Sequence, residues 1–348
     1  MPKEEGGRMS DASNRKPIGG MIRLLRNAAV AAIAALPTVS WAGEPENGTL
    51  SIVFENDLFY GTDRHYTNGV RGAWLSGPGD TPQWVLDPAR RFPLFPEGGT
   101  VRVEYALGQS MYSPGDIRLE NPPDGDRPYA GWLYGSVGLI AETGARLDQL
   151  SLTLGVVGPA SMAEPTQKFI HRQVDSPDPR GWDTQLHNEP GLILTYQRSW
   201  RSLISEPVAG LSFDVTPHLG GAGGNVFTYA NGGVMLRFGD GLLLDYGPPG
   251  IQPSLPGAGF FIPNPGLGWY LFGGIDGRAV ARNIFLDGNT FRDSRRVDKE
   301  PLIADFQFGA AVTWGNTRLS YVHLFRTPEF KGQNQMDEYG GFSLSQRF

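Results

Sequence analysis

Short runs of alternating apolar and polar residues, separated by glycine- and proline-rich segments, follow one another along most of this chain. In the run that begins at Leu150, leucines alternate with Ser151, Thr153 and Gly155. A period of two is typical of β-strands, and about ten residues is the length at which a tilted strand crosses a bilayer. The pattern predicts twelve strands. They lie near residues 49–57, 65–76, 100–111, 128–141, 147–158, 189–201, 207–220, 224–239, 266–285, 300–314, 317–327 and 337–348.

The end of the chain gives a further reason to expect a membrane barrel. Two alternating runs meet at a two-residue turn, Gly315-Asn316, and the last run ends at Phe348. A terminal aromatic residue that closes an alternating strand resembles the assembly signal of bacterial outer-membrane barrels. A soluble β-sandwich would also alternate, but its outward face would be charged. We therefore predict an all-β fold, a closed antiparallel transmembrane β-barrel of about 12 strands.

The N-terminal region has the three-part pattern of a secretory signal peptide. A short basic stretch follows Met21, an apolar run too short to span a bilayer covers 27–36, and small residues near Ala42 fit a cleavage site. We expect translation to start at Met21 and cleavage to follow Ala42. Residues 1–42 are then an N-terminal extension plus signal peptide, and residues 43–348 form a single outer-membrane barrel domain.

Three long connections separate the predicted strands. Two of them, 77–99 and 240–265, are rich in proline and glycine and are predicted to be loops that carry little chemistry. The third contains 165–174, whose helical spacing places Gln167 and His171 on one face. If the first strand runs outward from the periplasm, every odd-to-even connection lies outside the cell. The short helix is therefore predicted in an extracellular loop, at the same rim as the first hairpin.

Composition narrows the function classes. The 48 glycines and 28 prolines argue against a helical bundle, and the absence of cysteine excludes thiolate chemistry and a cysteine metal site. The formal net charge is −6, so we expect no nucleic-acid partner. An acidic surface can hold divalent cations. A monomer is the expected state.

Two segments contain candidate chemistry. Residues 54–69 gather carboxylates, amide oxygens and a hydroxyl at one hairpin tip, which suits calcium. An ordinary polar hairpin, in which asparagine and aspartate serve the turn, fits this composition at least as well. His171 lies beside Arg172 on the predicted helix, and a neutral imidazole can take a proton from water. A solvated surface histidine is the alternative.

Several common catalytic motifs are absent. The sequence contains no Gly-x-Ser-x-Gly elbow, no His-x-Ser pair, no His-Glu-x-x-His motif and no glycine-rich phosphate loop followed by lysine. An activated serine, a zinc site and a nucleotide site are therefore not supported.

The first hairpin, with Glu55-Asn-Asp-Leu-Phe followed by 62–69 (TDRHYTNG), resembles the signature of the outer-membrane lipid A 3′-O-deacylase family. Further blocks follow in the family's order at 109–114, 126–131, 156–159, 167–172, 181–190 and 223–227. The resemblance covers nearly all of the mature chain. It implies a twelve-stranded barrel that uses calcium to remove the 3′-linked acyloxyacyl chain from lipid A in the outer leaflet.

The resemblance also implies roles for individual residues. His171 corresponds to the catalytic histidine that activates a water, and Gln167 matches the glutamine one helical turn before it. Asn56, Asp57 and Thr67 match residues of the metal and oxyanion region, with Asn56 assigned to catalysis and Asp57 and Thr67 to the metal.

We assign substrate binding to Arg118, Arg172 and Tyr112. The sequence departs from the family pattern at two points. The acidic residue six positions after the histidine is replaced by Pro177, flanked by Asp175 and Asp178. The family's lysine in the second outer loop has Arg118 as its nearest basic counterpart.

Two other functions fit the same strand pattern. One is a catalytically silent barrel, porin-like or structural. The other is an outer-membrane phospholipase, which keeps the fold and calcium but changes the substrate, and the missing His-x-Ser pair counts against it.

Overall fold

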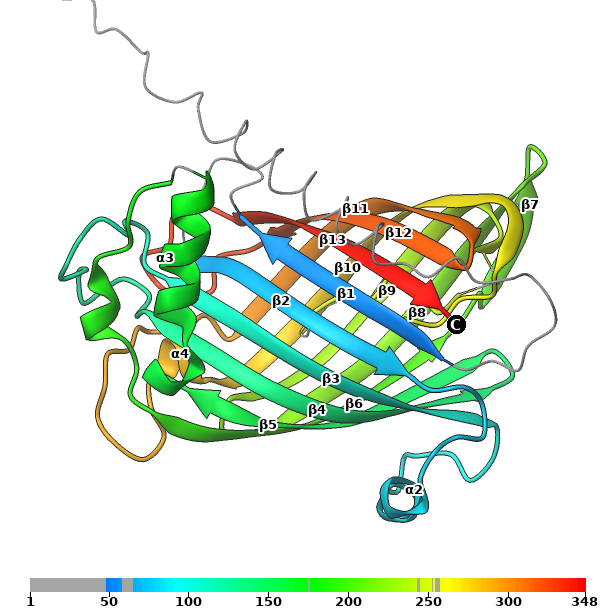
Figure 1. Cartoon of the computed structure of the whole chain (residues 1–348), viewed down its shortest axis with the longest axis horizontal. Helices are drawn as coiled ribbons and strands as arrows, with labels where there is room; N and C mark the ends of the chain where they lie inside the picture. Colours follow the sequence, from blue (N-terminus) through cyan, green and yellow to red (C-terminus); the bar gives the residue numbers. More distant parts are fainter. Residues whose placement is uncertain (1–47, 58–64, 175, 243–244, 252, 254–256) are drawn as a thin grey trace, which may run out of the picture.

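One antiparallel sheet, closed on itself, forms the wall of the protein (Figure 1). The computed structural model describes residues 48–57, 65–174, 176–242, 245–251, 253 and 257–348, so the predicted signal peptide and its cleavage site lie outside the described residues. The strands are β1 Thr49–Asn56, β2 His65–Leu75, β3 Thr100–Ser113, β4 Ala130–Thr143, β5 Arg146–Val157, β6 Glu189–Trp200, β7 Ile204–Val208, β8 Leu211–Gly224, β9 Phe227–Asp240, β10 Asn264–Asn283, β11 Leu302–Gly315, β12 Thr317–Arg326 and β13 Asp337–Arg347.

Two strand pairings close the barrel. β1 pairs with β13 along its whole length, and β6 pairs with β8. The short β7 pairs with β8 alone, so it is an extra strand beside a twelve-stranded wall. The predicted closed barrel is confirmed. The predicted strand 207–220 was wrong in its bounds, because Ala209 and Gly210 both adopt positive φ and turn the chain between β7 and β8.

The outer face of the wall is apolar. Side chains that point away from the lumen include Leu107, Leu154, Leu271 and Leu319, each more than half exposed. Their neighbours in each strand point inward, so the period of two becomes a lipid-facing band and a polar interior. Within the described part of the chain, no helix is long and apolar enough to cross a membrane.

Buried ion pairs fill much of the lumen. The Asp305 carboxylate accepts two hydrogen bonds from Arg326, each of 2.8 Å, and lies 2.9 Å from the Arg278 guanidinium. Because buried charges are costly without partners, this interleaving of carboxylates and guanidinium groups is what allows a charged interior to pack.

A segment between β9 and β10 folds back into the lumen, and we call residues 245–251, 253 and 257–261 the lumen segment. Its Asp245 carboxylate accepts hydrogen bonds from Arg237 and Arg318 at 2.6 and 2.9 Å. Its Ile251 amide donates to Glu55 at 3.0 Å. This predicted loop is therefore anchored inside the barrel by side chains of β1, β9 and β12.

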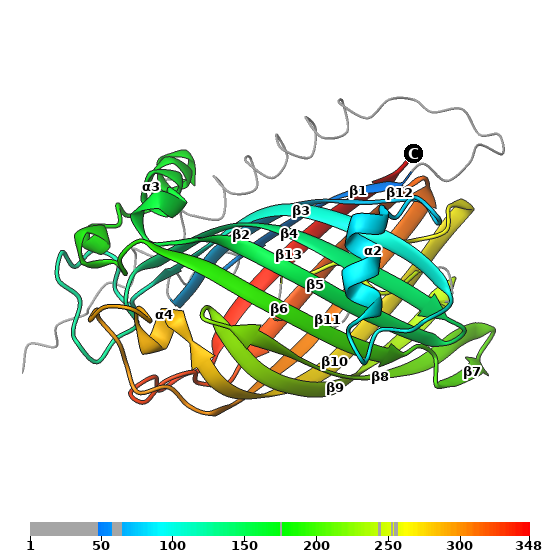
Figure 2. The ribbon, with the colours of Figure 1, turned by 90° about the horizontal axis from the view of Figure 1, so that it is seen from below.

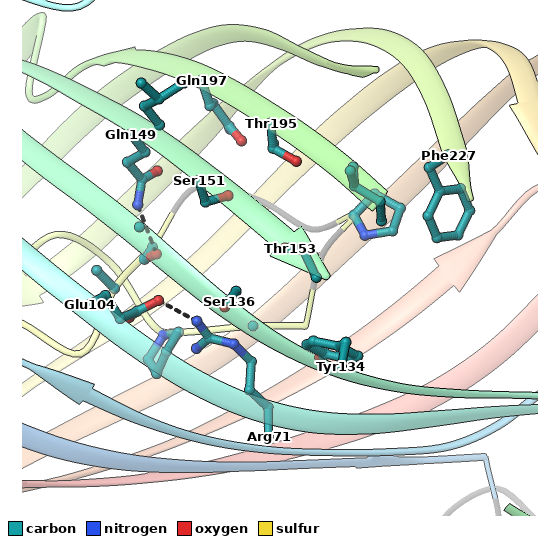
Figure 3. A pocket seen from close by; sticks show the side chains of 18 of the residues that line it. Arg71, Glu104, Tyr134, Ser136, Gln149, Ser151, Thr153, Thr195, Gln197 and Phe227 are labelled. Carbon is teal, nitrogen blue, oxygen red and sulfur yellow. Dashed lines mark hydrogen bonds and ion pairs between the residues drawn. The ribbon is translucent and has the colours of Figure 1, made fainter. Parts of the chain in front are cut away.

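The lumen retains a cavity of ≈ 120 Å³, large enough for a few waters. An ion pair between Arg71 and Glu104 lies at its wall, and Gln149 reaches across to the Gly257 carbonyl of the lumen segment at 3.2 Å (Figure 3).

Helices lie at both ends of the barrel. α2 (Gln83–Arg90) packs on the outside, at the end where the chain terminates, within a connection predicted to be a loop. Pro82 at its N-cap and Pro88 inside it concealed the helical signal in the sequence. α3 (Ala163–Val174) and α4 (Ile284–Asp287) lie at the opposite end (Figures 1 and 2). The predicted helix over 165–174 is confirmed by α3.

Candidate active site

Helix α3 lies against the outer face of the barrel wall, outside the lumen (Figures 1 and 2). Its first residue, Ala163, packs in a buried cluster with Met111 of β3 and with Tyr129 and Trp182. A Cβ added to Gly131 of β4 would come within 2.3 Å of the Ala163 Cβ, so only glycine permits this close approach. The helix therefore covers a patch of wall that would otherwise face lipid.

The covered patch contains a row of residues in register. Asn56 of β1 pairs with Asn68 of β2, and Asn68 pairs with Met111 of β3. All three point outward, because residues of the same parity on these strands, such as Ile52 and Leu107, are exposed on the lipid-facing side. Asn56 and Asn68 are nevertheless buried, each 2% exposed.

A β-bulge in β2 brings Thr67 into the same layer. The pairing of β2 with β3 shifts between Tyr66 and Asn68, so Thr67 is the extra residue. Its hydroxyl lies 2.5 Å from the hydroxyl of Ser113, which ends β3. The Asp57 amide donates to the Thr67 carbonyl at 3.4 Å, which holds Asp57 just beyond the end of β1.

His171 is buried on α3, and its ring orientation is fixed by the main chain. Its Nδ1 lies 2.6 Å from the carbonyl oxygen of Pro177. A carbonyl oxygen can only accept, so Nδ1 carries the hydrogen and donates it. In the neutral ring Nε2 is then the nitrogen that can take a proton. Thus Pro177, six residues after His171, supplies its main-chain oxygen to the histidine.

Gln167, one helical turn before His171, is also fixed by a donor. Its Oε1 accepts a hydrogen bond of 2.7 Å from the indole nitrogen of Trp182. Because an indole nitrogen only donates, this bond determines which end of the amide is oxygen. The Gln167 Nε2 is buried and has no hydrogen-bond partner among the described residues.

The three residues assigned to substrate binding do not join this layer. Tyr112 points into the lumen, where its ring stacks on Phe285 with a centroid distance of 4.0 Å. Arg118 is exposed in the connection after β3, and Arg172 is exposed on α3 next to His171. Of these three, Arg172 alone is adjacent to the buried histidine. Asp178 is exposed, and Asp175 lies outside the described residues.

Two carboxylates in the loops of this end have shifted pKa values. Hydrogen bonds from the Arg118 side chain and backbone lower the pKa of Asp116 to about 2. Burial alone would raise the pKa of Glu329, but Arg127 and Arg326 outweigh it and hold that pKa below its ordinary value. Arg127, itself fully buried, lies 2.7 Å from the Glu329 carboxylate. This ion pair ties the connection before β4 to the one before β13.

The donors in the layer match a hard cation in chemistry. Asp57 supplies a carboxylate, and Thr67 and Ser113 supply hydroxyls whose oxygens lie 2.5 Å apart. Among the residues that the structure describes, no three histidine, cysteine or acidic side chains lie close enough together to hold a metal ion. The residues therefore fit a calcium site with few charged ligands.

A family model described as "Outer membrane protein LpxR" matches residues 27–348 of the sequence. The chain belongs to the LpxR family. Its members form a barrel of the outer membrane, in agreement with the predicted localisation and with the apolar band on the wall.

One solved structure supports this fold. LpxR from Salmonella typhimurium is 19% identical, with a TM-score of 0.71 over 86% of this chain and 100% of that chain. The translocator domain of the autotransporter NalP from Neisseria meningitidis is 9% identical, with a TM-score of 0.37 over 96% of this chain and 98% of that one. The β domain of the Bordetella autotransporter BrkA has a TM-score of 0.39 at 10% identity, over 87% and 99% of the two chains. No curated protein matches this sequence.

Sequence reasoning did not single out Asn68, Ser113 or Trp182. Each stood inside a block that resembles the family, but no motif around it indicated a catalytic role. The signal that could have identified Asn68 was its register, since it lies directly beside Asn56 on the neighbouring strand.

Proposed function

We propose that this protein hydrolyses the ester of the 3′-linked acyloxyacyl chain of lipid A in the outer leaflet, with His171 as the general base. The supporting observation is the fixed orientation of His171, buried on a helix that lies on the lipid side of the wall. Substrate carried by the membrane reaches this side without entering the lumen.

In the proposed reaction, His171 Nε2 takes a proton from a water, and the water oxygen attacks the ester carbonyl carbon. Negative charge forms on the carbonyl oxygen. When the bond from the carbonyl carbon to the ester oxygen breaks, the imidazolium returns its proton to that oxygen. The products are a carboxylic acid and the 3′ hydroxyl. The Pro177 carbonyl orients the ring throughout and disperses part of the imidazolium charge.

We further propose that Asp57 and Thr67 hold calcium beside this site. When bound, the ion supplies positive charge near the developing oxyanion. A site with a single carboxylate should bind weakly, with a Kd of about 10⁻⁴–10⁻³ M. Chelation should therefore abolish activity, and millimolar calcium should restore it, whereas Asp57→Asn should shift the calcium concentration required upward.

The experiment that tests the function is mass spectrometry of lipid A from cells that produce the protein. Wild-type protein should remove the mass of one acyloxyacyl group, and His171→Ala should leave lipid A intact. His323→Ala, which alters a histidine on β12, is the matched control and should behave as wild type. Unchanged lipid A with folded wild-type protein and added calcium would reject the proposal.

The alternatives predict different results in the same samples. A phospholipase would alter phospholipid chains and spare lipid A. A silent barrel would alter neither. A porin-like role is disfavoured by the lumen segment and by the buried ion pairs that fill the barrel.

A further inference from the structure

The most unusual polar group in the layer under α3 is the side chain of Asn68. It is 2% exposed, and neither its Nδ2 nor its Oδ1 has a hydrogen-bond partner among the described residues. Most buried side-chain amides in folded proteins are satisfied, because an unpaired donor or acceptor loses its bonds to water without replacement. An amide retained under these conditions suggests a ligand that is bound there only during function.

The position of Asn68 indicates what the ligand is. It lies in register between Asn56 and Met111, on the lipid side of the wall and beneath the helix that carries His171. The second unpaired donor of the layer, Gln167 Nε2, comes from that helix. One of these neutral donors stands on the wall and the other on the helix that lies against it, and two such donors suit an oxygen that accepts twice, as an ester carbonyl oxygen does when it becomes an oxyanion.

We infer that Asn68 binds the scissile ester of the substrate, with Nδ2 donating to the carbonyl oxygen. This inference rests on the proposed function and adds a substrate-binding residue to it. The Asn68 Oδ1 remains available as an acceptor for the attacking water, so one amide can position both reactants. An aspartate could not replace it, because a carboxylate offers no hydrogen to the oxyanion and would repel it.

Two measurements on the purified protein in detergent micelles test this role, the rate of lipid A deacylation and the midpoint of urea unfolding. Asn68→Leu should lower kcat by about 10²–10³-fold, the usual loss of one oxyanion donor, and should raise the midpoint. Asn68→Asp should lower kcat to a similar extent. A residue that only supported the fold would instead lose activity together with stability.

Gln307→Leu provides the matched control. Gln307 is a buried amide on β11 whose Nε2 also lacks a partner among the described residues, but it faces the lumen. Its replacement should raise the midpoint and leave the rate unchanged. Asn68→Leu with wild-type kcat, or with a lowered midpoint, would overturn the assignment.

A binding measurement separates this inference from the proposed reaction. In the His171→Ala background, hexa-acylated lipid A should raise the unfolding midpoint, and adding Asn68→Leu should reduce that rise. If the wild type fails to hydrolyse lipid A but this difference is observed, the binding role stands and the reaction does not. If lipid A stabilises both variants equally, the binding role of Asn68 is rejected.

Discussion

The lumen and the layer under α3 treat buried polar groups in opposite ways. In the lumen, Asp305 contacts Arg278 and Arg326, and Asp245 contacts Arg237 and Arg318. Under α3, the Asn68 amide has no partner among the described residues. The charged groups of these two lumen networks pair with one another, whereas neither polar atom of the Asn68 side chain has a partner among the described residues. The paired charges stabilise the interior of the barrel, and the unpaired amide on its outer face is the group that we infer binds a ligand.

The largest effect is expected from breaking the lumen network. Asp305→Leu leaves the buried guanidinium groups of Arg278 and Arg326 without their shared carboxylate, which should cost about 3–5 kcal/mol of unfolding free energy. Urea unfolding in detergent micelles measures this loss. Asp124→Leu, at an almost fully exposed carboxylate, is the control and should not change the midpoint. If Asp305→Leu shifted the midpoint as little as Asp124→Leu does, the lumen ion pairs would contribute little to the unfolding free energy.

An intermediate effect is expected at the donor that orients Gln167. Trp182→Phe retains a ring in the cluster but removes the indole nitrogen, so the Gln167 amide can rotate. The rate of deacylation should fall about tenfold, which corresponds to about 1.4 kcal/mol, and the unfolding midpoint should change little. A wild-type rate in a folded Trp182→Phe protein would show that the orientation of Gln167 does not matter.

A smaller effect is expected at Pro177. Because the group that binds His171 is the main-chain carbonyl, Pro177→Ala should preserve the hydrogen bond and nearly the full rate. The main effect should be a small loss of stability, because alanine leaves the unfolded chain more conformational freedom than proline does. A rate as low as that of His171→Ala would indicate that the proline ring itself holds the loop.

The smallest effect is expected at the exposed pair of Asp116 and Arg118. Its stabilising contribution is present above the ordinary carboxyl pKa of 3.8 and is lost as the pH falls through about 2. Arg118→Ala should return the Asp116 pKa toward 3.8, as measured by carboxyl NMR, without a detectable change in unfolding midpoint. If Arg118 also binds substrate, as assigned from the sequence, the variant should raise KM more than it lowers kcat.

The sequence predicted the strands and the helix over 165–174 because alternation and helical spacing are local signals. It also predicted one rim for His171, Thr67 and Tyr112, because strand parity decides which end of the barrel each connection occupies. Strand parity does not determine whether a side chain points into the lumen or toward lipid. Tyr112 proved to point into the lumen, whereas the bulge at Thr67 directs that residue toward Ser113.

Other features depended on contacts between distant residues. The lumen segment is anchored by Arg237 on β9 and Arg318 on β12. No local sequence pattern predicts which residues of other strands will bind it. The role of Pro177 could not be predicted either. The atom that binds His171 is the main-chain carbonyl oxygen, which every residue type carries.

The lumen segment also matters to the cell that carries this protein. An outer membrane excludes many antibiotics and bile salts only while its barrels do not leak. Asp245, Ile251 and Ala258 fasten the segment inside the wall. The proposed reaction on the outer face needs no aqueous pore, so a barrel filled in this way can act on lipid without adding an open channel to the membrane.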